Sequence, residues 1–153
     1  MAIKSIDAKT LKQWLDNNEA VLFDVREQAE YNAENIPGSK LVPLSSICKK
    51  KLGDINNKKL VVHCKAGKGR TSTVLTMIDI IKNAPNVSLE EIVARQYAMG
   101  SENLFDTTLR KNGTYKQKTL DTRKEFISLY YDFISQRKAG GVQLWSDWRN
   151  LQE

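Results

Sequence analysis

A cysteine and an arginine separated by five residues form the centre of the stretch HCKAGKGRTS, which runs from His63 to Ser72. Gly67 and Gly69 lie between them and permit positive φ angles and close approach of the backbone. An apolar run precedes the stretch and a helical pattern follows it, so we interpret the stretch as a loop between a buried strand and a helix. Such a loop directs backbone N–H groups inward at a helix N-terminus, which creates an anion-binding nest.

The side chains of this loop suit phosphoryl transfer. Arg70 offers a planar fork that matches two phosphate oxygens. The same positive field lowers the pKa of a thiol from ~8.5 to about 3.5–7.5, so Cys64 would face a bound phosphoryl group as a nucleophilic thiolate. Thr71 could donate a hydrogen bond to the departing sulfur. A buried structural cysteine would leave the glycines and the arginine unexplained. The predicted phosphate-binding residues are Lys65, Ala66, Gly67, Lys68, Gly69 and Arg70.

His63 is the only histidine of the chain. Because side chains alternate along a strand, His63 points away from Cys64, and we expect it to make an internal hydrogen bond that supports the loop rather than to act in catalysis. The sequence holds no second cluster of cysteine and histidine, so we expect neither a metal site nor a cofactor.

Length and composition indicate one globular domain over residues 1–153. Two cysteines suggest a reducing compartment, and neither a signal peptide nor a membrane span is present, so we expect a cytosolic monomer. The net charge is +6, and residues 49–70 carry eight lysines and arginines against Asp54 alone. Such charge favours phosphorylated small molecules, acidic lipid headgroups or nucleic acid. With the phosphate loop, we expect a phosphorylated protein or inositol phosphate, with an acidic membrane surface as a further candidate partner and no nucleic acid.

The elements that position the loop alternate between strand and helix in the first half of the chain. The expected strands are Ile3–Ile6, Ala20–Val25, Lys40–Val42 and Lys59–His63, and Asp7 is expected to cap a helix that carries Leu11, Trp14 and Leu15. This order predicts an α/β fold with a central, mostly parallel sheet of about four strands flanked by helices.

After the loop the pattern is entirely helical. We expect a helix over 72–82, a second helix capped by Ser88 and Glu91, a surface loop over 101–118 and a long final helix. Aromatic residues of the final helix and the segment LWSDW are expected to pack in the core. The apolar stripe of the final helix consists of Phe126, Ile127, Tyr130, Tyr131 and Ile134.

The motif HCKAGKGRT resembles the signature loop of cysteine-dependent protein-tyrosine and dual-specificity phosphatases. The interior lysines Lys65 and Lys68 resemble those of the phosphatase-and-tensin type, which implies a preference for acidic inositol headgroups; the basic segment Arg110–Lys124 could add to it. Further along, VSLEEIVARQYAMG, RKEFISLYYDFI and WSDW resemble the tyrosine-phosphatase-like inositol phosphatases (bacterial phytases). This resemblance covers roughly residues 60–150 and suggests that residues 59–153 form a tyrosine-phosphatase-like half.

Residues 1–48 resemble a different family. The segment LFDVREQAEYNAENIPGSKLVPLSSI is similar to a rhodanese domain, and rhodanese sulfurtransferases usually have a loop one residue shorter, sized for a sulfane sulfur. The cell-cycle phosphatases on the rhodanese fold have the longer loop, which this chain shares. We therefore predict a phosphomonoesterase that acts through a phosphocysteine. The alternatives are a rhodanese-like sulfurtransferase and a catalytically weak phosphate-binding module.

The phosphatase resemblance implies a general acid, usually an aspartate about thirty residues before the cysteine, and residues 29–36 contain none. Glu30 and Glu34 are the carboxylates in that window, and either could donate the proton if its pKa is raised; both could equally be surface residues. Asp24 and Arg26 are expected to form a buried structural pair. Cys48 could form a protective disulfide with Cys64.

Overall fold

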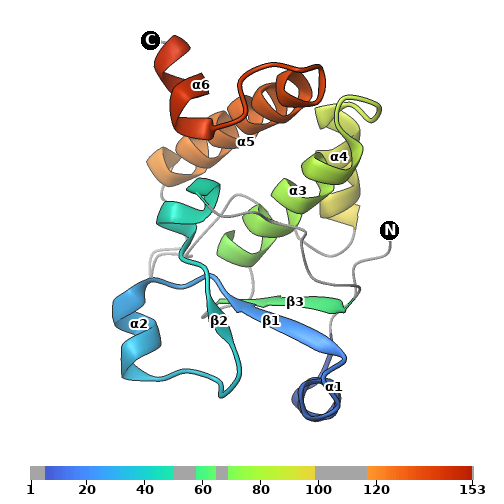
Figure 1. The fold of residues 1–153 in the computed structure, drawn as a ribbon, viewed down its shortest axis with the longest axis vertical. Coiled ribbons are helices and arrows are strands. Elements are labelled where there is room, and N and C mark those ends of the chain that lie inside the picture. The colour runs from blue at the N-terminus through green and yellow to red at the C-terminus, as the bar shows by residue number, and fades with distance from the viewer. Residues whose placement is uncertain (1–5, 50–57, 65–68, 99–116, 153) are drawn as a thin grey trace.

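A small parallel sheet forms the base of the molecule, and helices flank it (Figure 1). The structure is a computed structural model that describes residues 6–49, 58–64, 69–98 and 117–152. The three strands of the described residues are β1 (Ala20–Asp24), β2 (Lys40–Leu41) and β3 (Lys59–His63), in the order β2-β1-β3. β1 lies between the other two and pairs in parallel with both. The predicted α/β class with a parallel sheet is confirmed.

The first half of the chain supplies the short helices beside this sheet. α1 (Ala8–Asp16) begins at Asp7, whose Oδ1 accepts a hydrogen bond from the Thr10 N–H at 2.7 Å, so the predicted N-cap is confirmed. α2 (Gln28–Ala33) follows β1, and the 3-10 helix η1 (Leu44–Lys49) follows β2. Gly38, between α2 and β2, has a φ of +86°, which other residues adopt only with strain.

The two faces of the sheet have different surroundings. Side chains alternate along a strand, and Phe23 and Val25 belong to the main hydrophobic core, whereas Leu22 is fully buried outside that cluster. In the register of the pair β1–β3, Asp24 lies beside His63, which places both on the face of Leu22. Cys64 follows His63 and packs against the main core. The alternation therefore separates Cys64 from His63, as the sequence predicts.

After β3, the described residues form four helices, and Figure 1 shows α3, α4, α5 and α6 grouped on one side of the sheet. They are α3 (Gly69–Asn83), α4 (Leu89–Ala98), α5 (Gln117–Lys138) and α6 (Trp145–Leu151). α3 packs on both α4 and α5. A partly buried ion pair between Asp79 and Arg95 joins α3 to α4. The helix that carries Arg70 in its first turn is thus packed against both neighbouring helices.

Aromatic side chains join α5 to α6. The Trp145 ring lies 5.6 Å from Phe126 and 5.5 Å from Phe133, measured between centroids, and both contacts are edge-on. Trp148 is 2% exposed, and its Nε1–H donates to Oε1 of Gln136 at 2.9 Å. The prediction that the aromatic residues of the final helix and of LWSDW pack in the core is confirmed.

Some expected boundaries differ from the structure. The expected strand Ile3–Ile6 lies outside the described residues except for Ile6, which is not in a strand, so the described sheet has three strands instead of about four. α3 begins at Gly69, three residues before the expected start, and α5 includes 117 and 118, which the sequence assigned to a loop. Residues 101–116 of that loop lie outside the described residues. None of the helices described here is long and apolar enough to cross a membrane.

Candidate active site

Cys64 and Arg70 lie on either side of one strand-to-helix connection. Cys64 directly follows β3, and Arg70 is the second residue of α3. The carboxyl ends of parallel strands are where α/β proteins bind ligands, and the N-terminus of α3 adds its positive dipole to this edge. Lys65, Ala66, Gly67 and Lys68 lie outside the described residues, so their predicted contacts with phosphate stay predictions. Gly69, also predicted to bind phosphate, is the first residue of α3.

Glu30 of α2 binds the guanidinium of Arg70. Arg70 Nη1 donates to Oε2 of Glu30 at 2.7 Å, and Nη2 donates to Oε1 at 3.1 Å. The pair uses the terminal edge of the guanidinium, and Nε takes no part in it. The side chains of Arg70 and Glu30 are 24% and 34% exposed. This bidentate pair orients Arg70 and leaves the Nε edge outside the pair.

The electrostatics of the pair decide the ionisation of Glu30. The hydrogen bonds from Arg70, and after them the Glu27 backbone N–H, lower the pKa of Glu30 to about 2. Bonding to Glu30 raises the pKa of Arg70, and the charge of the nearby Cys64 raises it further. Glu30 is therefore a carboxylate at neutral pH, and it has no proton to donate. This geometry favours a positioning role for Glu30 over the general-acid role considered from the sequence.

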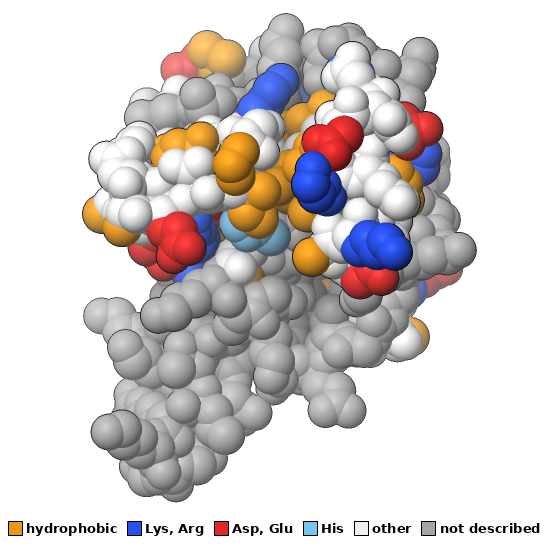
Figure 2. Space-filling model, turned by 90° about the horizontal axis from the view of Figure 1, so that it is seen from below, with side chains coloured by type: hydrophobic (Ala, Val, Ile, Leu, Met, Phe, Trp, Pro, Cys, Tyr) orange, Lys and Arg blue, Asp and Glu red, His pale blue; other side chains and the backbone are white. Residues whose placement is uncertain are grey.

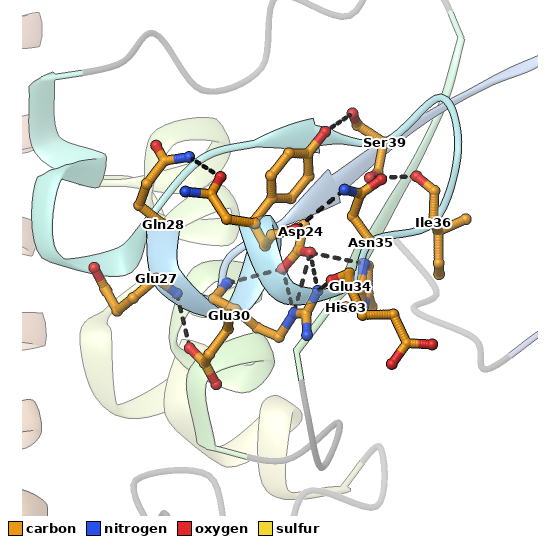
Figure 3. Close-up of polar contacts among 12 residues, drawn as sticks. Asp24, Glu27, Gln28, Glu30, Glu34, Asn35, Ile36, Ser39 and His63 are labelled. Carbon is orange, nitrogen blue, oxygen red and sulfur yellow. Dashed lines mark hydrogen bonds and ion pairs between the residues drawn. The ribbon is translucent and has the colours of Figure 1, made fainter.

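Glu34, the second candidate acid, is an exposed residue at the C-terminal end of α2. Its backbone carbonyl accepts a hydrogen bond from Nη2 of Arg26 at 2.7 Å. Figure 3 shows its side chain directed away from Asp24. The role of Glu34 as a proton donor stays a prediction.

Thr71 is buried next to Arg70 and is 8% exposed. Its Oγ1 has no hydrogen-bond partner within the described parts of the chain. The bond to the Cys64 sulfur that the sequence suggested is therefore not formed in this structure. A buried hydroxyl without a partner is unfavourable by about 1–3 kcal/mol, so Thr71 keeps a donor for a later step or for a ligand.

Asp24 and Arg26 form the buried structural pair that the sequence predicted. Nη2 and Nε of Arg26 donate to Asp24 at 2.7 and 3.1 Å, and Asp24 is fully buried. Burial alone raises the pKa of Asp24, but the hydrogen bonds from the Arg26 side chain and backbone outweigh it, and the pKa is lowered. The pair fixes the end of β1, where Figure 3 labels Asp24.

His63 lies on the same face of the sheet as Asp24, with its Nε2 at 3.5 Å from Oδ2. Figure 2 shows this single histidine in pale blue, with hydrophobic side chains beside it. Nε2 is buried and has no hydrogen-bond partner among the residues that the structure describes. The sequence did not specify which ring nitrogen of His63 makes the expected internal hydrogen bond. Nε2 does not make it, since the facing Asp24 Oδ2 already accepts from Arg26, and a bond through Nδ1 stays a prediction.

Sequence reasoning missed the residues that hold Glu30. The backbone N–H of Glu27 donates to Oε2 of Glu30 at 2.9 Å, and Ser45 of η1 binds the Glu27 carboxylate in turn. The spacing Glu27-x-x-Glu30 at the start of a helix is the available signal, since an acidic residue at the third helical position often bonds back to the cap. The side chain of Cys48 is outside the described residues, so a pairing with Cys64 stays a prediction.

The candidate site thus lies at a strand-to-helix connection of a small parallel sheet, with Cys64 after β3 and Arg70 in the first turn of α3. Residues 7–89 match the rhodanese-like domain, and the chain belongs to this family. The matched residues extend beyond residue 48, where the sequence suggested that the rhodanese-like half ends, and they include Cys64, Arg70 and the whole of α3.

Several curated proteins from bacteria are similar to this chain. Effector protein hopD2 of Pseudomonas syringae pv. tomato is 34% identical over 93 residues, which are 61% of this chain and 20% of that protein. The uncharacterized proteins AvrBs1.1 of Xanthomonas campestris pv. campestris and Xanthomonas euvesicatoria are each 31% identical over 93 residues, 89% of their length. The chain thus spans about a fifth of hopD2 and most of AvrBs1.1.

Proposed function

We propose that this protein is a cysteine-dependent phosphomonoesterase. The observation that carries the proposal is the site geometry: five residues separate Cys64 at the end of β3 from Arg70 at the start of α3, and Glu30 holds Arg70 by its terminal edge. The resemblance to the cysteine-dependent phosphatases implies that a loop of this length is sized for a phosphate. Arg70 and the helix dipole supply the positive charge that a phosphoryl group needs.

The proposed reaction has two steps. In the first, the Cys64 thiolate attacks phosphorus, the bond from phosphorus to the substrate oxygen breaks, and that oxygen takes a proton. In the second, water attacks the phosphocysteine, the phosphorus–sulfur bond breaks, and phosphate and the thiolate are released. Arg70 stabilises the charge of both transition states because it already lies within electrostatic range of the thiol.

The leaving oxygen needs a proton donor. Glu30 is ionised and bonded to Arg70, which leaves Glu34 as the candidate acid from the sequence. Without a competent acid, the first step depends on the leaving group, so aryl phosphates are expected to react faster than alkyl phosphates. A ratio of rates close to one for phenyl and alkyl phosphates would show that an acid operates.

The substrate class rests on the lysines of the loop. Lys65 and Lys68 stand between Cys64 and Arg70 in the sequence and would supply two cations, and an inositol polyphosphate needs such cations for its neighbouring phosphates. We therefore propose that polyphosphorylated inositol compounds compete well with phosphotyrosine. If Lys65→Ala/Lys68→Ala loses activity equally toward aryl phosphate and inositol phosphates, the lysines support only the phosphate-binding loop, and the proposed preference for inositol phosphates is wrong.

The test is phosphate release from an aryl phosphate with EDTA present. Cys64→Ser is expected to be inactive, and Arg70→Lys severely impaired, because an ammonium cannot reproduce the bidentate fork. Arg149→Lys on α6 is the matched control, since its guanidinium lies over Trp145, and it is expected to keep full activity. Activity retained in Cys64→Ser would overturn the mechanism.

A rhodanese-like sulfurtransferase is the second candidate, and the family match favours it. In that reaction the Cys64 thiolate takes the outer sulfur of thiosulfate, sulfite leaves, and cyanide then accepts the sulfur from the persulfide as thiocyanate. Intact-mass analysis distinguishes the sulfurtransferase from the phosphatase and from a module that only binds phosphate. A gain of one sulfur atom after thiosulfate supports the transferase, and bound phosphorylated ligand without product supports a binding module.

A further inference from the structure

The proposed function makes Arg70 the principal cation of the site, and the structure shows what holds its carboxylate partner. Oε2 of Glu30 accepts a hydrogen bond from Nη1 of Arg70 at 2.7 Å and another from the Glu27 backbone N–H at 2.9 Å. The position of this oxygen therefore depends on the backbone of residue 27, which is the N-cap of α2.

Glu27 is in turn fixed from a different element. The Ser45 hydroxyl donates to Oε2 of Glu27 at 2.7 Å, and the Ser45 backbone N–H lies 3.3 Å from Oε1. Ser45 stands at the start of η1, eighteen residues along the chain from Glu27. Figure 3 shows the side chain of Glu27 directed away from Asp24, whereas Glu30 bonds back to the Glu27 nitrogen.

We propose that Ser45 and Glu27 are positioning residues for Arg70, and that they act through Glu30. The contacts form a continuous relay from the first turn of η1 through the cap of α2 to the proposed phosphate site. Its purpose is to keep Arg70 pre-oriented, so that little ordering of the guanidinium is needed when an oxyanion binds. The inference rests on the proposed function, since it assigns Arg70 to an anion.

A charge effect can be separated from a positioning effect. The negative charge of Glu27 also acts on Arg70 directly, and this contributes to the raised pKa of Arg70 after the larger effect of Glu30. Ser45 is neutral, so Ser45→Ala removes one hydrogen bond of the relay and leaves every charge in place. A fall in anion affinity in Ser45→Ala therefore reports on position.

The experiment measures the dissociation constant of inorganic phosphate by isothermal titration calorimetry at fixed pH and ionic strength. Ser45→Ala is expected to weaken binding about two- to fivefold, at the lower part of the range for one hydrogen bond because the Ser45–Glu27 contact is exposed. Ser45→Thr keeps the hydroxyl and should restore the wild-type value. Ser46→Ala is the matched control, because the Ser46 hydroxyl bonds within its own turn to the Pro43 carbonyl.

A double-mutant cycle tests the route of the effect. In a Glu30→Ala background, which removes both acceptor oxygens at position 30, Ser45→Ala should change phosphate affinity no further, because the relay acts through Glu30. Equal affinities for wild type, Ser45→Ala and Ser46→Ala would overturn the relay and leave the proposed function intact. Failure of the wild type to bind phosphate would overturn both. Losses that simply add in the double mutant would show that Ser45 acts by another route.

Discussion

Replacing Glu30 with glutamine is expected to destabilise the fold at neutral pH and to weaken oxyanion binding. The change removes the carboxylate charge that holds the terminal edge of Arg70 through two hydrogen bonds. A glutamine amide has one acceptor oxygen, so it can satisfy only one of the two guanidinium nitrogens. Arg70 is then less ordered, and phosphate must fix its orientation on binding.

The contribution of Glu30 to the free energy of unfolding can be calculated from the shift of its pKa. The bonds from Arg70, followed by the Glu27 N–H, lower the pKa of Glu30 from 4.5 to about 2. At about 1.4 kcal/mol per unit, the whole shift would correspond to about 3 kcal/mol. The Glu30 side chain is 34% exposed, and screening by solvent reduces the expected contribution to about 1 kcal/mol.

Because folding lowers the pKa of Glu30, the sign of the pH dependence of the free energy of unfolding is fixed. A lowered carboxyl pKa stabilises the fold at pH values above 4.5, and the contribution disappears as the pH falls toward 2. The assay is urea unfolding followed by tryptophan fluorescence between about pH 1.5 and about pH 7, a range that includes both pKa values. The free energy of unfolding of Glu30→Gln should lie about 1 kcal/mol below that of the wild type at pH 7, and the two curves should converge in acid.

The control for this titration is Glu125→Gln on α5, an exposed carboxylate. It should track the wild type over the whole range. The reasoning is refuted if Glu30→Gln is as stable as the wild type at pH 7, or if its deficit is the same at low and neutral pH. A deficit that grows in acid would also contradict the account.

Three further predictions concern stability and turnover. Asp24→Asn should lower the free energy of unfolding by about 3 kcal/mol, because it leaves the Arg26 guanidinium without its buried counter-charge; a change under ~1 kcal/mol in urea unfolding would contradict this. Trp148→Ala should cost about 3–5 kcal/mol by emptying the junction of α5 and α6, as measured by denaturant midpoint; an unchanged midpoint would show that α6 does not contribute to the fold. Thr71→Val should leave stability unchanged or slightly raised, because its hydroxyl is buried without a partner, while slowing phosphate release; an unchanged release rate would remove Thr71 from the mechanism.

Local patterns in the sequence were enough to place the loop on its scaffold. Alternation along β1 and β3 separates Cys64 from His63, and the apolar run before Cys64 identifies the strand that ends there. The Asp7 cap likewise follows from residue type and spacing alone. These features depend on neighbours in the chain, so their physical causes can be read from the sequence.

The partners of the site could not be predicted in the same way. Glu30 and Arg70 are forty residues apart, and only the pairing of β1 with β3 brings α2 close to the start of α3. A carboxylate on a polar helix gives the same pattern whether it is a surface residue, a proton donor or the partner of an arginine. The environment of His63 is also tertiary, since it depends on which side chain already occupies Asp24.

The central claim is that Cys64 carries the phosphoryl group of the substrate. The most direct measurement is intact-mass analysis of protein quenched rapidly in acid during turnover of an aryl phosphate, followed by peptide mapping. We expect the mass of one phosphoryl group on the peptide that contains Cys64, and none in Cys64→Ala. Phosphate release without such an adduct in either protein, or an adduct on another residue, would contradict the account.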